Sequence, residues 1–272
     1  MLCIRSVSID TPSITSPRNV SVSVRHGRPI CGVQGVLGST PPGPQSYATG
    51  MCGRYQLTIE GTFLVDEYNL GVATGQDAFR PRYNVAPTQH MPVVRQGERG
   101  REAVPMRWGL VPFWMKPKND KMPAGWINAR AETAAEKPAF RAAYKRRRCL
   151  IPATGFYEWQ ARDDGPKVPH LIRLADEGVM TFAGLWETWT APDGSEADTY
   201  TVLTTAPNEV MRPIHDRMPV MLDREAFNAW LDSAHDPREL LNSYPPDQMY
   251  AVPVATTINS PRNDEPGAVE VL

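Results

Sequence analysis

Hydrophobic positions in this chain fall into short runs rather than long helical stretches. From residue 51 onward, runs of β-branched and aromatic residues are bounded by Pro, Gly, Asn or Asp, a pattern typical of strands. The runs predict strands over residues 92–95, 104–110, 149–159, 170–174, 180–186, 200–204, 218–222 and 250–254. Helical spacing of apolar residues predicts helices over residues 62–68, 138–147, 208–212, 224–232 and 237–242. We therefore expect an α+β fold, with a curved, barrel-like antiparallel β core and peripheral short helices.

Residues 1–50 do not continue this pattern. They are rich in Ser, Val, Pro and Gly, and Asp10 is their only acidic residue. Three interpretations are open: a start codon assigned too far upstream, with synthesis beginning at Met51; a removable leader resembling a transit peptide; or a retained tail. We expect residues 51–257 to form a single domain and residues 258–272 to form a flexible C-terminal tail.

Composition narrows the class of protein. The 272-residue chain is 41% hydrophobic and 22% charged, with a formal net charge of −1, as in ordinary globular proteins. It has no apolar run that could span a bilayer and no secretion signal, so we expect a cytoplasmic protein without membrane contact, associated with the nucleoid if bacterial. A nucleic-acid partner would have to meet a local basic face, because the near-zero net charge supplies no overall attraction.

The cysteines indicate a reducing compartment. Cys3 and Cys31 lie in the extension, which leaves Cys52 and Cys149 in very different sequence settings rather than in a disulfide framework. No Cys-x-x-Cys or His-Glu-x-x-His motif is present, so we expect no metal. We likewise expect no organic cofactor, and a monomer.

Met51 is followed by Cys52 and Gly53, as an initiator methionine is followed by a small residue. Removal of Met51 would make Cys52 the first residue, with an α-amine and a thiol on adjacent carbons. Such a residue condenses with an aldehyde to an imine and then closes to a thiazolidine. An α-amine has a pKa of about 7.7–8.0 and a free thiol one of about 8.5, so both nucleophiles are available near neutral pH.

Four further segments stand in a characteristic order after Cys52. They are YNVAPT at residues 83–88, WINARAE at 126–132, GFYEW at 155–159 and PIHDRMP at 213–219. Together with MCGRY at residues 51–55, they closely resemble the SOS-response-associated peptidase family, from about residue 51 to about residue 254. The resemblance implies a protein that shields abasic sites in single-stranded DNA through a covalent bond. The extension of residues 1–50 departs from the family pattern.

The resemblance also implies four catalytic residues. Cys52 matches the N-terminal cysteine that forms the thiazolidine with the ring-opened sugar, and Asn128 the residue that holds cysteine and sugar in place. Glu158 matches the acidic residue that transfers protons, and His215 the imidazole in imine formation and reversal. Loss of water from a carbinolamine needs a positioned acid, which independently suits Glu158.

We expect DNA to contact residues near these positions. Arg54 and Arg130 are candidate phosphate ligands, because a guanidinium binds phosphate oxygens in pairs. Asn84, Trp108 and Trp126 complete the predicted DNA-binding set, with the tryptophans offering surfaces for stacked bases. The basic stretches at residues 116–121 and 145–148 could supply further positive charge.

Alternatives remain open at this point. Glu158 could be a solvent-facing strand residue, and His215 could cap a turn beside a surface pair of Asp216 and Arg217. A Cys–His peptidase, with Cys52 as nucleophile and His215 as base, is a second hypothesis, and self-removal of the leader would itself expose the Cys52 amine. A third is a non-catalytic reader of single-stranded or modified DNA, whose binding would be reversed by salt.

Overall fold

The structure is a computed structural model, and it describes residues 52–73, 79–117, 119 and 121–272. Within this part, five strands pair in a closed ring in the order β4, β5, β11, β10, β7 and back to β4. They are β4 (His90–Gly97), β5 (Gly100–Trp108), β7 (Arg148–Ala153), β10 (Met180–Thr190) and β11 (Glu196–Thr205). β5 and β11 run parallel, and the other neighbours are antiparallel. The predicted barrel-like core is confirmed, with parallel contacts in addition to the antiparallel ones.

Short strands extend the ring at its edges. β2 (Leu70–Ala73) runs parallel to β5, and β6 (Asn128–Arg130) runs parallel to β11. β12 (Met218–Pro219) pairs antiparallel with β11. β11 is therefore the strand to which both the segment around residue 128 and the segment around residue 218 attach.

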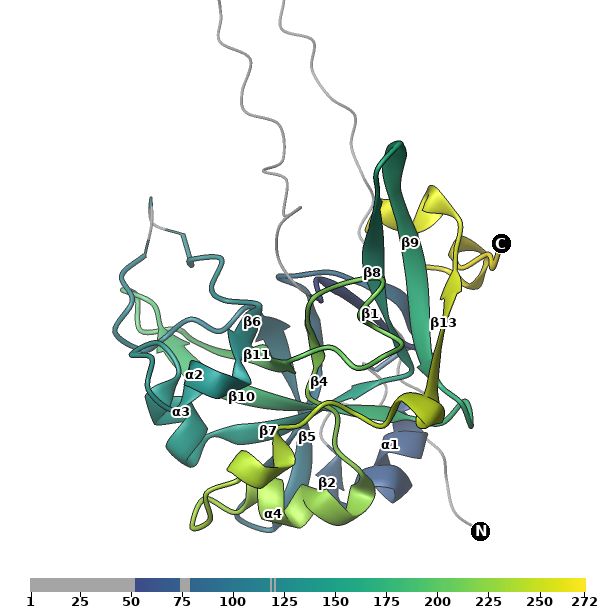
Figure 1. Cartoon of the computed structure of the whole chain (residues 1–272). Helices are drawn as coiled ribbons and strands as arrows, with labels where there is room; N and C mark the ends of the chain where they lie inside the picture. The colour runs from purple at the N-terminus through teal and green to yellow at the C-terminus, as the bar shows by residue number, and fades with distance from the viewer. Residues whose placement is uncertain (1–51, 74–78, 118, 120) are drawn as a thin grey trace, which may run out of the picture. The chain divides into compact units, whose positions relative to one another are not determined.

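A second sheet lies beside the ring, with strand order β13, β9, β8, β1, β3. Its strands are β1 (Arg54–Leu57), β3 (Arg82–Val85), β8 (Gly155–Arg162), β9 (Gly165–Leu174) and β13 (Met249–Pro253). Figure 1 shows the β8–β9 hairpin projecting beyond the other strands of this sheet. One face of the sheet shares a hydrophobic core with the ring, through residues such as Tyr55, Phe156 and Phe182.

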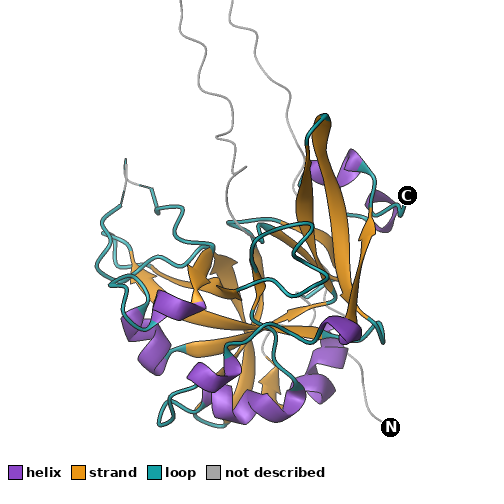
Figure 2. Cartoon of the chain, in the orientation of Figure 1, coloured by secondary structure: helices purple, strands orange, loops and turns teal. Residues whose placement is uncertain are grey.

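Helices cover the outside of the strands (Figure 2). They are α1 (Gly61–Tyr68), α2 (Ala131–Ala134), α3 (Arg141–Arg146) and α4 (Phe227–Leu231). Short 3₁₀ turns are η2 (Arg224–Ala226), η3 (Arg238–Leu240), η4 (Pro246–Gln248), η5 (Thr256–Asn259) and η6 (Pro266–Ala268). Tyr68 of α1 and Trp230 of α4 pack against Leu150 and Ala183 of the ring in a second core. No helix in the described part is long and apolar enough to cross a membrane.

Several element boundaries differ from the predictions. The run 149–159 is two strands, β7 and β8, which separate at Thr154 and enter different sheets. The stretch 208–212 is a hydrogen-bonded turn rather than a helix, because the Asn208 side chain accepts the Met211 N–H over 3.0 Å. Strands β1, β2, β3 and β6 were not predicted, because each is short and β1, β3 and β6 also carry polar residues.

The predicted flexible tail is instead packed. The Asp264 carboxylate accepts hydrogen bonds from the N–H groups of Tyr83 and Asn84, at 2.7 and 2.8 Å. Val271 forms a β-bridge with Val254. We call residues 256–264 the C-terminal strap, because they fasten the end of the chain to β1, β3 and β8. The expected N-terminal extension, Met51, and residues 118 and 120 of the basic stretch lie outside the described residues.

Candidate active site

Cys52 lies immediately before β1, at a position fixed by the pairing of β1 with β8. Arg54 stands opposite Tyr157 in this pairing, so the chain entering β1 passes Glu158. Cys52 is 3% exposed, and its φ of 35° lies in the left-handed region that few non-glycine residues adopt. Its backbone N–H donates a 2.5 Å hydrogen bond to Oε1 of Glu158. Two predicted catalytic residues that are far apart in sequence are thus in direct contact.

Burial controls the proton affinity of both groups. It raises the pKa of the Glu158 carboxyl above its ordinary value, against the opposing effects of the His215 charge and of hydrogen bonds from Cys52. Burial also raises the pKa of the Cys52 thiol well above its ordinary value, and the charge and hydrogen bonding of Glu158 raise it further. Both shifts thus disfavour the charged form of each group.

His215 lies at the end of a turn, where its charge acts on Glu158. Its backbone N–H donates to the Met211 carbonyl over 2.8 Å. Its Nδ1 accepts a 3.2 Å hydrogen bond from the Arg217 N–H and lies 3.1 Å from Oδ1 of Asp216. His215 therefore combines a place in the turn with an electrostatic effect on Glu158.

Strand β6 carries Asn128 and Arg130, two of the residues predicted to belong to the site. Asn128 pairs with Val202 of β11, and the preceding Ile127 packs against the core cluster that contains Cys52. Asn128 is half-buried and Arg130 is exposed. Alternate strand residues share a face, so both side chains lie on one side of β6 while Ala129 enters the core.

The two tryptophans predicted to bind DNA differ in exposure. Trp108 is 1% exposed, donates its indole N–H to the Ile127 carbonyl over 2.9 Å and stacks on Tyr200. The prediction that Trp108 offers a surface to bases is therefore wrong, because core packing covers both faces of its ring. Trp126 is 38% exposed, and Trp114 and Phe113 nearby are also exposed.

Asn84 and Arg54 hold the C-terminal strap rather than facing a ligand. The buried Asn84 amide donates to the carbonyls of Ile258, Ser260 and Asn263, at 2.9 to 3.1 Å. Arg54 donates to Oδ1 of Asn84 over 2.7 Å and to the carbonyl oxygens of Ile258 and Asn259, at 3.0 and 3.1 Å. The predicted DNA-binding role of Asn84 is corrected to a structural one, because the side chain is buried and internal partners occupy its amide. Arg54 also holds the strap but is only half-buried, and its contact with DNA stays a prediction.

Part of the basic stretch 145–148 is also structural. Arg147 pairs with Glu187 at 2.5 Å. Arg148 is 5% exposed, donates to the carbonyls of Asp232 and His235, and lies over the Trp230 ring. Arg148 therefore supports the packing of α4 against the ring, whereas Arg147 is held by β10.

Arg217 is a site residue that sequence reasoning missed. It is buried, pairs with both carboxylate oxygens of Glu132 at 2.5 and 2.7 Å, and donates to the Thr204 carbonyl. Its positive charge lowers the pKa of the Cys52 thiol, against the larger effects that raise it. The sequence shows that Arg217 follows His215 by two residues, but it does not show that Arg217 is buried.

The arrangement of these side chains suits proton transfer. One carboxyl contacts the nitrogen and influences the thiol of the same cysteine, with an imidazole and a guanidinium close by. Among the described residues, no group of three or more His, Cys, Asp or Glu side chains could hold a metal ion.

Known proteins resemble this chain in sequence and in fold. Residues 51–261 match the model of the family described as SOS response associated peptidase (SRAP). The abasic site processing protein YoqW of Bacillus subtilis is 41% identical over 225 residues, covering 81% of this chain and 99% of the relative. The abasic site processing protein HMCES of Xenopus tropicalis is 34% identical over 227 residues, covering 72% of this chain and 68% of the relative.

Solved structures of other proteins resemble this chain in fold. A crystal structure of a protein from Bacteroides thetaiotaomicron has a TM-score of 0.71 and 27% identity, covering 81% of this chain and all of the other. One from Bordetella bronchiseptica has a TM-score of 0.63 and 28% identity, covering 75% of this chain and all of the other. Sequence and fold together show that this chain belongs to the SOS response associated peptidase (SRAP) family.

Proposed function

We propose that this protein links itself covalently to abasic sites in single-stranded DNA through Cys52, and so shields the lesion during the response to DNA damage. The observation that carries the proposal is the 2.5 Å contact between the Cys52 nitrogen and Oε1 of Glu158. When Cys52 is the first residue, this nitrogen is an α-amine beside the Glu158 carboxyl. Relatives named abasic site processing proteins support the same substrate.

The chemistry needs two bonds to one carbon. The α-amine attacks the aldehyde carbon of the ring-opened sugar, and Glu158 protonates the hydroxyl of the carbinolamine, which leaves as water to give an imine. The Cys52 sulfur then adds to the imine carbon, and its proton passes through Glu158 to the nitrogen. One aldehyde, one amine and one thiol thus yield one thiazolidine and one water.

The neighbouring residues take supporting roles in this proposal. His215 exchanges protons with Glu158 during imine formation and reversal. Asn128 on β6 holds the sugar beside the cysteine, since its amide offers both a donor and an acceptor. The imine also acidifies the adjacent sugar carbon, so slow strand cleavage by β-elimination is a proposed side reaction.

The DNA strand is proposed to follow the exposed side chains around β6. Arg130 is exposed and available for a phosphate. Phe113, Trp114 and Trp126 are exposed aromatics on which bases can stack. This set replaces Trp108 and Asn84, which are buried, and adds to the half-buried Arg54.

Removal of the residues before Cys52 is a prerequisite of this chemistry. Glu158 is placed to protonate the nitrogen that a cleavage before Cys52 releases, so self-processing is compatible with the site. A general Cys–His peptidase is supported less well. Its nucleophile is a thiolate activated by imidazole, whereas burial and Glu158 raise the pKa of this thiol.

Intact mass spectrometry tests the proposal. Single-stranded DNA with one abasic site is mixed with the form beginning at Cys52 and, separately, with a form that retains one residue before Cys52. We expect a heat-resistant species at the summed mass less one water from the first form only. Cys52→Ala should retain salt-sensitive binding without the adduct. No adduct from a folded protein with a free Cys52 amine would overturn the proposal.

A further inference from the structure

We infer that a cavity beside β6 is a subsite for an unstacked base adjacent to the abasic site, an inference that rests on the proposed function. The cavity measures about 520 Å³. Among its lining residues are Trp114, Trp126, Asn128, Arg130, Lys137 and Phe140. We call it the β6 cavity.

Aromatic side chains form the walls of the β6 cavity. Trp126 is 38% exposed and Trp114 is 51% exposed, although large aromatic side chains usually bury most of their surface. The buried ring of Phe140 meets Trp126 edge to face, with centroids 5.9 Å apart at 79°, and so fixes the orientation of the indole. Trp126 is thus held in place beside an open space, as a stacking platform requires.

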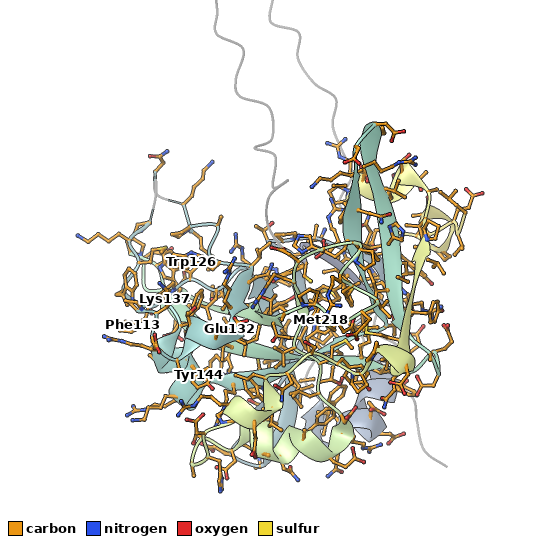
Figure 3. The ribbon with its side chains drawn as sticks, viewed as in Figure 1. Phe113, Trp126, Glu132, Lys137, Tyr144 and Met218 are labelled. Atoms are coloured by element: carbon orange, nitrogen blue, oxygen red, sulfur yellow. The ribbon has the colours of Figure 1, made fainter. Side chains whose placement is uncertain are left out.

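Positive charge borders these aromatic walls. Arg130 and Lys137 are both exposed and line the β6 cavity. Glu132 lies in the same segment, but its carboxylate is bound by Arg217 at 2.5 and 2.7 Å. In Figure 3, Trp126 and Lys137 lie close together on the side of the molecule that carries β6 and α2. An apolar wall with a cationic rim complements a flat base flanked by phosphates better than it complements an uncharged ligand.

The position of Asn128 indicates which nucleotide enters. Asn128 lines the β6 cavity and is also the residue proposed to hold the abasic sugar. A base in this cavity therefore belongs to a nucleotide next to the lesion. Such a base has lost one stacking neighbour, so turning it out of the strand costs less than it would in intact DNA.

A thermodynamic cycle with the full chain tests this subsite. The DNA carries a tetrahydrofuran residue, an abasic analogue without an aldehyde, so that binding stays at equilibrium. Each further strand carries a second tetrahydrofuran that removes one more base. The series covers the first and second positions on the 5′ side and on the 3′ side of the lesion, one position at a time. Dissociation constants are measured for the parent and for Trp126→Ala. Phe63→Ala, which truncates a 49% exposed aromatic on α1, is the matched control.

We expect Trp126→Ala to weaken binding of the base-containing strand by roughly fivefold to hundredfold, the range for one stacked base. Removal of the base at one flanking position should weaken the parent similarly and leave Trp126→Ala almost unaffected. Trp126→Phe should recover part of the loss, and Phe63→Ala should behave as the parent. Strictly additive losses at every flanking position, or no loss with Trp126→Ala, would overturn the inference.

The same proteins, started at Cys52 and mixed with a true abasic site, separate this inference from the proposed function. If the parent forms the adduct but the cycle is additive, the subsite is wrong and the crosslinking proposal stands. If the parent forms no adduct while the cycle shows coupling, the cavity binds a base but the proposed chemistry fails.

Discussion

Replacing Glu158 by Gln tests two expected consequences of a buried carboxyl beside Cys52. One is a loss of stability when the carboxyl ionises, and the other is faster crosslinking. The side chain is 4% exposed, and burial raises its pKa. Gln keeps the volume and an oxygen that can accept the Cys52 N–H, but it carries no charge and transfers no proton. We therefore expect a variant that is more stable above mildly acidic pH and slower in crosslinking.

The sign of the stability effect follows from linkage. The pKa of Glu158 is higher in the folded state than in the unfolded chain, where it is about 4.3. Below the unfolded value both states hold the proton, so ionisation costs no stability. As pH rises from there to the raised folded value, the unfolded chain ionises first and the parent loses stability. Each pH unit between the two pKa values lowers the free energy of unfolding of the parent by about 1.4 kcal/mol. The Gln variant does not undergo this loss, because its side chain does not ionise.

The rate effect has the opposite direction. A positioned acid or base contributes about 10²- to 10⁴-fold to the rate of a step that moves a proton. Since Glu158 is the group in contact with the Cys52 nitrogen, Glu158→Gln should slow adduct formation by about 100-fold or more. The slow rate should also lose the pH dependence that Glu158 gives to the parent.

Two assays check this pair of effects. Urea unfolding of the full chain at several values between pH 4 and pH 8 measures stability, and single-turnover adduct formation by the forms that begin at Cys52, followed on denaturing gels, measures the rate. Glu187→Gln is the control, because Glu187 is another buried carboxyl of raised pKa but pairs with Arg147, and it should leave the rate unchanged. A stability difference that does not vary with pH would refute the linkage argument. An unchanged rate would remove Glu158 from proton transfer.

Four further substitutions give distinct expectations. Asn84→Ala should lower the free energy of unfolding by about 1–3 kcal/mol in urea titrations, because strap carbonyls lose their donor. Trp108→Ala should cost about 3–5 kcal/mol as a large core truncation, whereas Trp126→Ala should cost less, about 0.5–1.5 kcal/mol, for the lost ring contact with Phe140; thermal unfolding compares them. Arg217→Gln should move the pH profile of Cys52 alkylation to higher pH, because it removes the charge that lowers the thiol pKa.

The boundary between β7 and β8 was not predicted from the apolar pattern. β7 is buried along its whole length, and its apolar run continues directly into β8. The break at Thr154 left no trace in the pattern, because each strand is covered in its own sheet. β6 consists only of Asn128, Ala129 and Arg130, so its existence depends on hydrogen bonds from β11 and not on its own sequence.

The candidate site was predictable as a set of residues but not as a division of roles among them. Trp108 and Trp126 lie in one stretch of chain, yet one fills the core and the other borders a cavity, and only tertiary packing decides between them.

Asn84 and Arg54 resembled ligand-binding residues until the strap, more than 170 residues along the chain from Asn84, was seen to occupy their hydrogen-bonding groups. The strap residue Asn259 also accepts the indole N–H of Trp159 at 2.7 Å, so it contacts β1 just after Cys52 and β8 just after Glu158. The strap contacts of Arg54 and Trp159 therefore help to hold β1 and β8 in the register that places the Cys52 nitrogen on the Glu158 carboxyl.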